Sequence, residues 1–235
     1  MRVILASSLE AICRVAEQLG PLREQVVFLG GAVTGLLLTD SAVPEARYTE
    51  DVDVIVSADS RSGYYRWEEA LEARGFVRGR EPGDPICRWI ASGVIVDVMP
   101  SGEDALGFGN RWYVPAMEAA GKILLPDASE IRLVTAPYFL ATKLEAFRSR
   151  GRGDYLLSRD MQDIVSVVDG RPEVVPEVAG SEESLCFFLA GEFRELLSQE
   201  AFLEALSGHL LPDAASQKRA TVVEQRFRQM AAPSL

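Results

Sequence analysis

Two aspartates stand one residue apart at the start of an apolar run, in YTEDVDVIV (residues 48–56). Alternate side chains of a β-strand point to the same side, so Asp51 and Asp53 are expected to face the same way. Two ionised carboxylates placed in this way repel each other, and a divalent cation compensates them best. The pair therefore indicates a metal site. The alternative is that Asp51 caps the strand and Asp53 faces solvent.

A third acid, Asp97, lies inside the apolar run VIVDVMP (residues 94–100). An aspartate in such a strand is costly unless it is paired or binds a ligand. If the two strands are neighbours, Asp51, Asp53 and Asp97 converge on one point. Three oxygen ligands suit a hard cation, Mg²⁺ or Mn²⁺, in phosphoryl or nucleotidyl transfer. The single histidine, His209, argues against a zinc site built on several histidines and is expected to be structural.

A glycine pair follows the apolar run that precedes these acids, in FLGGAVTG (residues 28–35). A strand that ends in Gly30 and Gly31 and feeds a helix presents backbone N–H groups with no side chain in the way, which suits a phosphate. A mere tight turn is the alternative interpretation. Together with the three acids, the pair predicts a site for a nucleotide and its metal ion.

These motifs resemble the signature of the nucleotidyltransferase superfamily typified by DNA polymerase beta, in particular its AbiEii/MenT-like branch of bacterial toxin-type proteins. The resemblance rests on residues 29–56, with the glycine pair and the segment from Arg47 through Thr49 to the acids, and on the later strand acid. Residues 137–171 are similar to a segment of that branch in which a helix lysine precedes a basic stretch and an Asp-x-x-Asp pair. The resemblance covers residues 26 to about 170.

The resemblance implies a role for each matching residue. The implied metal ligands are Asp51, Asp53 and Asp97; the implied catalytic residues are these three with Lys143 and Asp163; the implied nucleotide-binding residues are Gly30, Gly31, Thr34, Arg47, Thr49 and Lys143. Ala32 stands where many members have a serine, and the separation between the glycines and the acids implies an inserted loop at residues 40–48.

The helix lysine has two interpretations. Lys143 could contact the triphosphate, or it could flank an apolar helix face with its ammonium group in water. Asp160 and Asp163 share a helix face at i and i+3 and could orient Lys143, or they could simply decorate the helix after Ser158. Both interpretations remain open at this point.

The elements that must position these residues follow from periodicity and turn signals. The pattern predicts helices over 7–22, 32–40, 62–75, 138–150, 158–170, 184–211 and 217–229, and strands over 25–31, 51–57, 76–81, 87–92 and 94–101. Ser92-Gly93 predicts a tight hairpin turn between the last two strands. The expected fold is α/β (α+β): a nucleotidyltransferase-like mixed sheet flanked by helices in residues 1–114, followed by a helical C-terminal domain in residues 115–235.

Composition limits the cellular setting and the partners. The chain has 235 residues, is 48% hydrophobic and carries a formal net charge of −11, so bulk binding of nucleic acid is not expected. It lacks an apolar run long enough for a membrane span, and its N-terminus turns polar too early for a secretory signal. Three scattered cysteines fit a reduced cytoplasm.

The expected function is a Mg²⁺-dependent nucleotidyltransferase that moves an NMP from an NTP to an acceptor, which could be tRNA, a protein or a small molecule. The resemblance adds a possible role as the toxin of a toxin–antitoxin pair. One alternative is a toxin-like interaction protein with weak or no turnover, regulated by a partner antitoxin protein. Another is an aminoglycoside-type enzyme, whose cationic substrate would suit the acidic chain.

Overall fold

The structure is a computed structural model that describes residues 7–232, and the chain divides into two compact units. The first comprises the chain up to Leu36 together with Arg47–Thr135. The second comprises Leu37–Ala46 together with the chain from Ala136 onward. The sequence placed the division after residue 114, whereas these units divide at 135/136. The reason is that two strands between 115 and 135 pair into the sheet of the first unit.

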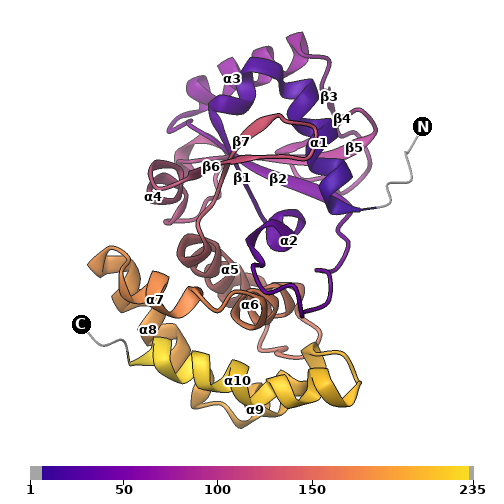
Figure 1. The fold of residues 1–235 in the computed structure, drawn as a ribbon. Helices are drawn as coiled ribbons and strands as arrows, with labels where there is room; N and C mark the ends of the chain where they lie inside the picture. Colours follow the sequence, from indigo (N-terminus) through magenta and orange to yellow (C-terminus); the bar gives the residue numbers. More distant parts are fainter. Residues whose placement is uncertain (1–6, 233–235) are drawn as a thin grey trace. The chain divides into compact units, whose positions relative to one another are not determined.

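The first unit is built on a seven-stranded mixed sheet with the order β3-β4-β5-β2-β1-β7-β6 (Figure 1). Its strands are β1 Val26–Leu29, β2 Asp51–Val56, β3 Val77–Arg78, β4 Arg88–Ala91, β5 Val94–Pro100, β6 Gly121–Leu124 and β7 Glu130–Leu133. β2 pairs with β5 and β1 with β7 in parallel, and the other neighbours are antiparallel. Together with the helical second unit, this confirms the expected mixed α/β fold class.

Local sequence signals explain the ends of the main elements of this unit. Helix α1, Ser8–Leu19, begins where the Ser7 hydroxyl accepts a hydrogen bond from the Glu10 amide (3.2 Å). Helix α3, Arg61–Ala73, begins in the same way at Ser60. The β4–β5 hairpin turns at Ser92 and Gly93, which both have positive φ (49° and 80°), as a two-residue type I′ turn requires. The predicted hairpin is confirmed.

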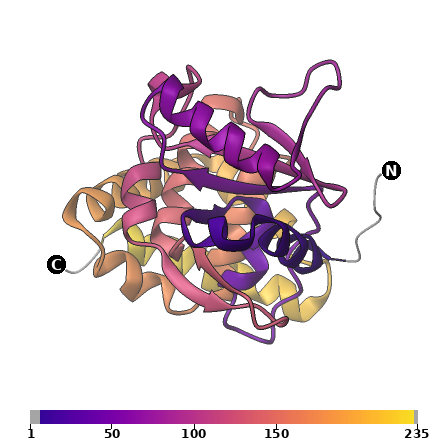
Figure 2. The same cartoon turned by 90° about the horizontal axis from the view of Figure 1, so that it is seen from above.

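Helices α1 and α3 lie on one face of the sheet (Figures 1 and 2). The two helices are joined at their ends, because the Gln18 side chain donates to the Arg74 carbonyl and the Arg74 guanidinium donates to the Gln18 carbonyl. On the same face, Arg78 stacks over the buried Trp89 ring at 4.7 Å and pairs with Glu68 of α3 at 2.6 Å. Asp51, Asp53 and Asp97 alternate with the residues of this face and therefore lie on the opposite one, here called the acidic face.

The strands β6 and β7 were missed by the sequence analysis, which assigned residues from 115 onward to a helix-rich half. Both strands are four residues long. β6 is mostly exposed and shows no alternation, whereas β7 alternates polar residues with the buried Ile131 and Leu133, a regular signal at the shortest usual strand length that the sequence analysis passed over. β7 nevertheless joins β1, with Leu133 opposite Phe28. The short helix α4, Tyr113–Glu118, precedes this pair of strands.

Several elements are shorter than the pattern predicted. The helix expected over 32–40 is a 3₁₀ turn, Gly31–Val33, followed by the single helical turn α2, Thr34–Leu37. Strand β3 has two residues. Two further 3₁₀ turns, Gly20–Glu24 and Glu103–Ala105, complete the described elements of this unit.

The second unit is helical. Its elements are α5 Ala136–Arg150, α6 Arg159–Gly170, α7 Val174–Ala179, α8 Glu183–Leu197, α9 Glu200–Leu206, a 3₁₀ turn Ser207–His209 and α10 Ala214–Ala231. The helix expected over 184–211 breaks between α8 and α9. Its core includes Phe193, Phe202 and Phe227, whose ring centroids lie 5.3 Å apart in edge-to-face pairs.

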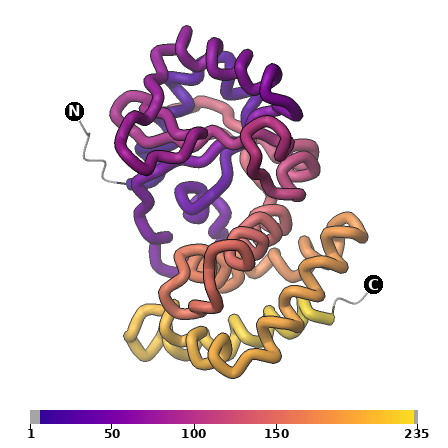
Figure 3. Tube along the Cα trace, turned by 180° about the vertical axis from the view of Figure 1, so that it is seen from behind, coloured from indigo at the N-terminus to yellow at the C-terminus, as the bar shows by residue number. Residues whose placement is uncertain are grey.

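The loop Leu37–Ala46 is part of the second unit (Figure 3). The amides of Thr39 and Asp40 both donate to the Gly170 carbonyl at the end of α6 (2.9 Å each). Arg219 of α10 contacts Asp40 and Asp169 at 2.8 and 2.7 Å. The helix expected over 217–229 therefore includes an arginine that holds the loop Leu37–Ala46 against the rest of its unit. Across residues 7–232 we find no helix that combines the length and apolar character needed to cross a membrane.

Candidate functional site

The strand that carries Asp51 and Asp53 is the neighbour of the strand that carries Asp97, which is the condition that the predicted convergence required. In the parallel pair of β2 and β5, Asp53 is directly opposite Asp97. Asp51 lies two residues before Asp53 in β2, so its side chain is on the same face. Both acids are half-buried. On the other side of β2, the antiparallel register sets Leu29, the last residue of β1, opposite Asp53. The acidic face thus meets the end of β1, where the glycine pair begins.

Gly30 is in contact with one of these acids. Its φ of 76° and ψ of −169° belong to a region of backbone space that is open almost only to glycine. A Cβ on Gly30 would lie 1.8 Å from Oδ2 of Asp53, so no other residue fits without moving that carboxylate. Gly31 is buried and opens the 3₁₀ turn. The structure therefore brings the glycine turn against the β2 acids.

Asp97 is held by an arginine that the sequence analysis did not single out. The Arg88 guanidinium donates from Nε to Oδ1 of Asp97 at 2.9 Å and from Nη2 to Oδ2 at 2.8 Å. These hydrogen bonds raise the pKa of Arg88. Burial, and next the charge of Asp97, raise the pKa of the neighbouring Cys87 thiol to about 12. Arg88 could have been found by counting back from the Ser92-Gly93 turn, which sets it opposite Asp97.

The fit of a divalent cation differs among the three acids. Asp51 and Asp53 offer hard oxygen donors on one face, and the missing Cβ of Gly30 leaves room for the Asp53 carboxylate. Asp97 has both oxygens engaged by Arg88. Within residues 7–232, no three His, Cys, Asp or Glu side chains are grouped closely enough to hold a metal ion. The β2 pair supplies carboxylate oxygens of the kind that such a cation prefers, whereas both oxygens of Asp97 are engaged by Arg88.

The predicted nucleotide-binding threonines are buried. Thr49 is 5% exposed, and its hydroxyl donates to the Asp51 carbonyl at 3.0 Å while its amide donates to the Ser8 hydroxyl at 3.2 Å. Thr49 thus fixes the start of β2. Thr34 is 1% exposed, and its hydroxyl has no hydrogen-bond partner in the part of the chain that the structure describes. Arg47 is half-buried just before β2, and Ala32 is buried within the 3₁₀ turn.

Lys143 lies in the second unit and is 7% exposed, so its ammonium group is not in water as one interpretation had it. Its Nζ lies 3.0 Å from Oδ1 of Asp160 and 2.7 Å from Oδ2 of Asp163. Arg150 contacts Asp160 with two hydrogen bonds of 2.8 Å. Of the open interpretations, this geometry agrees with the one in which the two acids orient Lys143. We call these four residues the Lys143 network.

Charge compensation in this network is visible in Asp160. Burial alone would raise the pKa of its carboxyl, but the hydrogen bond from Arg150 and the charge of Lys143 bring that pKa below the ordinary value of 3.8. The network also accounts for one of the arginines at the end of α5, Arg150. A second, Arg148, pairs with Glu192 at 2.8 Å. These arginines therefore serve contacts within the unit.

His209, which we expected to be structural, contacts the backbone of its own unit. Its Nε2 lies 2.7 Å from the Tyr155 carbonyl. Burial lowers the pKa of His209, and the hydrogen bond to Tyr155 offsets part of that change.

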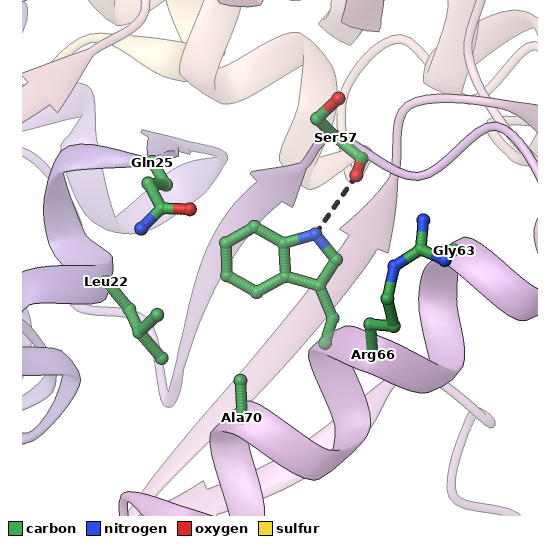
Figure 4. A pocket seen from close by; sticks show the side chains of 7 residues that line it. Leu22, Gln25, Ser57, Gly63, Arg66 and Ala70 are labelled. Carbon is green, nitrogen blue, oxygen red and sulfur yellow. Dashed lines mark hydrogen bonds between the residues drawn. The ribbon is translucent and has the colours of Figure 1, made fainter.

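A solvent-open pocket of about 300 Å³ lies at the far end of β2 from the acids (Figure 4). The Trp67 indole donates to the Ser57 carbonyl at 3.0 Å across it. The lining residues are Leu22, Gln25, Ser57, Gly63, Arg66, Trp67 and Ala70. None of them is acidic, and Ser57 is six residues beyond Asp51, roughly 20 Å along a strand. This pocket is therefore separate from the acidic face.

No protein-family model and no curated protein matches the chain. Among solved structures, the chain is similar to the crystal structure of an antigenic nucleotidyltransferase-like protein from Paracoccidioides brasiliensis. The two share 19% sequence identity with a TM-score of 0.47, over 89% of this chain and 96% of that one. Because both values are low, this likeness does not bear on the chemistry of the acidic face.

Proposed function

We propose that the chain is a nucleotidyltransferase that moves an NMP from an NTP to an acceptor and requires Mg²⁺ or Mn²⁺. The observation that carries the proposal is the contact of the Gly30 turn with Asp53, beside Asp51 and opposite Asp97 on one sheet face. A glycine turn that offers backbone amides next to paired carboxylates provides for both parts of a metal–triphosphate: the phosphates and the cation.

Each residue of this face has a defined task in the proposal. Asp51 and Asp53 would hold the cation, which when bound would neutralise phosphate charge and polarise the α-phosphate. The turn at Gly30 and Gly31 binds the β- and γ-phosphates through backbone N–H groups, since Ala32 offers no hydroxyl. Asp97 either joins the ligand set or accepts the proton of the acceptor hydroxyl. A bond forms between that oxygen and the α-phosphorus, and pyrophosphate leaves.

The structure alters the proposed role of Lys143. Its ammonium group is engaged by two buried carboxylates, so contact with a triphosphate would require it to leave at least one of them. We therefore assign Lys143 to the fold of the helical unit and place the phosphate contacts on the glycine turn, with Arg47 as the candidate cation. We assign Asp163, the ion-pair partner of Lys143, to the same structural role.

The acceptor is the open part of the proposal. A net charge of −11 favours a cationic small molecule, such as an aminoglycoside, or a basic protein over a nucleic acid bound through phosphates. tRNA remains an acceptor to be tested, because the sequence left tRNA, a protein and a small molecule open. In the alternative of a toxin-like interaction protein, a partner protein would restrain the acidic face, and nucleotide would bind with little turnover.

Incubation of the purified chain with each α-labelled NTP, Mg²⁺ and one acceptor pool tests the proposal. The pools are total tRNA, lysate protein and a panel of aminoglycosides. Label carried by one pool identifies the base and the acceptor together. Asp104→Asn, an exposed acid of the same unit, serves as the matched control for Asp53→Asn, which should not transfer label. Nucleotide binding without transfer to any pool would favour the interaction protein, and absence of both would contradict the proposal.

A further inference from the structure

Arg88 and Asp97 form a bidentate ion pair on the acidic face. They are directly opposite each other in the antiparallel pair of β4 and β5. Asp97 is 8% exposed, and both of its oxygens accept hydrogen bonds from the guanidinium, at 2.9 and 2.8 Å. A buried carboxylate needs a compensating charge. The planar guanidinium supplies that charge and donates hydrogen bonds to both carboxylate oxygens at once. A cation that binds Asp97 must therefore compete with the Arg88 guanidinium.

The Arg88 side chain packs closely against Gly79 and Asp84. A Cβ on Gly79 would lie 2.9 Å from the Arg88 Cγ and 2.7 Å from Oδ2 of Asp84. Asp84 is a second, longer contact of the guanidinium, at 3.4 Å. The Arg88 side chain is still 22% exposed, so it can move without opening the core. When it leaves Asp97, Asp84 remains to receive its charge.

A second arginine in the same sheet shows what a purely structural pair looks like. Arg78 pairs with the buried Glu68 at 2.6 Å and stacks on the Trp89 ring, on the face covered by α3. It contacts none of the acids of the acidic face in any pair that the structure gives. Arg78 and Arg88 are therefore matched in residue type, sheet and acid partner, and differ in the face on which they lie.

We propose that Arg88 is a displaceable counter-ion of Asp97: a divalent cation bound by Asp51 and Asp53 recruits Asp97 only by exchanging with the Arg88 guanidinium. Arg88 thus sets the cation affinity of the acidic face and keeps Asp97 compensated until the cation arrives. The inference rests on the proposed function, because it takes Asp97 to be a ligand of that cation.

Calorimetric titration with Mn²⁺ alone, at pH 8 and without nucleotide, tests the exchange. Arg88→Gln should bind Mn²⁺ about tenfold more tightly than the natural chain, since the competing charge-assisted hydrogen bonds are gone. Arg78→Gln should bind as the natural chain does. In a chain that already carries Asp97→Asn, adding Arg88→Gln should change the affinity far less, because the contested ligand is absent.

Arg88→Lys keeps the positive charge but cannot make the bidentate hydrogen bonds, so it should increase the Mn²⁺ affinity by less. It serves as the second variant if Arg88→Gln does not fold. Thermal melting establishes that each variant is folded. Unchanged or weaker Mn²⁺ binding by folded Arg88→Gln and Arg88→Lys, with binding lost in Asp53→Asn, overturns the exchange and leaves the metal site standing. If neither the natural chain nor either Arg88 variant binds Mn²⁺, the exchange and the proposed cation site both fail.

Discussion

The acidic face of the first unit and the Lys143 network of the second use aspartates in opposite ways. Asp160 and Asp163 are 4% and 1% exposed, and each lies within 3.0 Å of a cationic group. Asp51 and Asp53 are half-buried at the start of a strand, with their like charges on one side. The buried acids of the network hold helices together, whereas the pair beside the glycine turn is the one to which we assign the cation in the proposed function. The comparison therefore sets an observed structural use of aspartate beside a proposed chemical one.

The largest expected effect is on activity, at the acidic face. Asp53→Asn keeps the shape of the side chain and removes its charge, so transfer should fall by more than about a hundredfold, as expected for loss of a metal ligand. The melting temperature should stay the same or rise slightly, because like-charge repulsion with Asp51 is relieved. Steady-state transfer assays and thermal melts, each with Asp104→Asn as control, measure both. A large fall in melting temperature would show that Asp53 is structural.

Next in size is the effect of removing the lysine of the network. Lys143→Ala leaves Asp160 and Asp163 buried with one cation fewer, which should cost about 3–5 kcal/mol of unfolding free energy. Denaturant unfolding measures it. Lys122→Ala, which breaks an exposed pair with Glu130, should change little by comparison. If Lys143→Ala unfolds as the natural chain does but binds NTP weakly, the lysine belongs to the chemistry after all.

A glycine substitution sharpens the contrast, because Gly30 serves both backbone and site. Gly30→Ala should cost about 1–3 kcal/mol more than Gly107→Ala, which has a similar φ of 79° but open space around its Cα. The added Cβ also displaces the Asp53 carboxylate, so Mn²⁺ binding should weaken in Gly30→Ala alone. Denaturant unfolding and calorimetry report the two effects. Equal stability of the two variants would mean that the Asp53 contact is not tight.

The smallest expected effect is a pH dependence of the network. A carboxyl with a folded-state pKa below its ordinary value stabilises the fold above that value and loses this contribution as the pH falls through the lowered pKa. For Asp160 the ordinary value is 3.8, so the loss should occur below about pH 4. The stability difference between the natural chain and Asp160→Asn, measured by urea unfolding from pH 7 to pH 3, should be constant down to about pH 4 and then shrink. A difference that grows toward low pH would contradict the charge compensation.

Local signals in the sequence predicted most elements of the first unit. The Ser92-Gly93 turn set the β4–β5 register, and the apolar runs around Asp53 and Asp97 marked two central strands. Strands β6 and β7 were missed because their pairing is decided by β1, more than a hundred residues earlier in the case of Leu133 and Phe28. A non-local partner leaves no trace in the mostly exposed β6, whereas the alternation in β7 was a signal that its four residues made easy to overlook.

The candidate site was predictable to the same degree. Alternation along a strand was enough to place Asp51 and Asp53 on one face. The environment of Lys143 was not visible, since burial depends on how α6 packs on α5, and its two acids lie 17 and 20 residues further along the chain. The position of Arg88 opposite Asp97 could have been predicted by counting residues back from the Ser92-Gly93 turn. A basic residue in a short strand, however, does not indicate a function by itself until the acid opposite it is recognised.

The central claim is that Asp51 and Asp53 hold a divalent cation beside the glycine turn. The most direct test is a crystal structure of the chain with Mn²⁺ and a non-hydrolysable NTP, read in an anomalous difference map. The account predicts a peak at roughly 2.0–2.6 Å from carboxylate oxygens of both Asp51 and Asp53, with the triphosphate at Gly30 and Gly31. Nucleotide bound elsewhere, or a peak that touches neither aspartate, would contradict it.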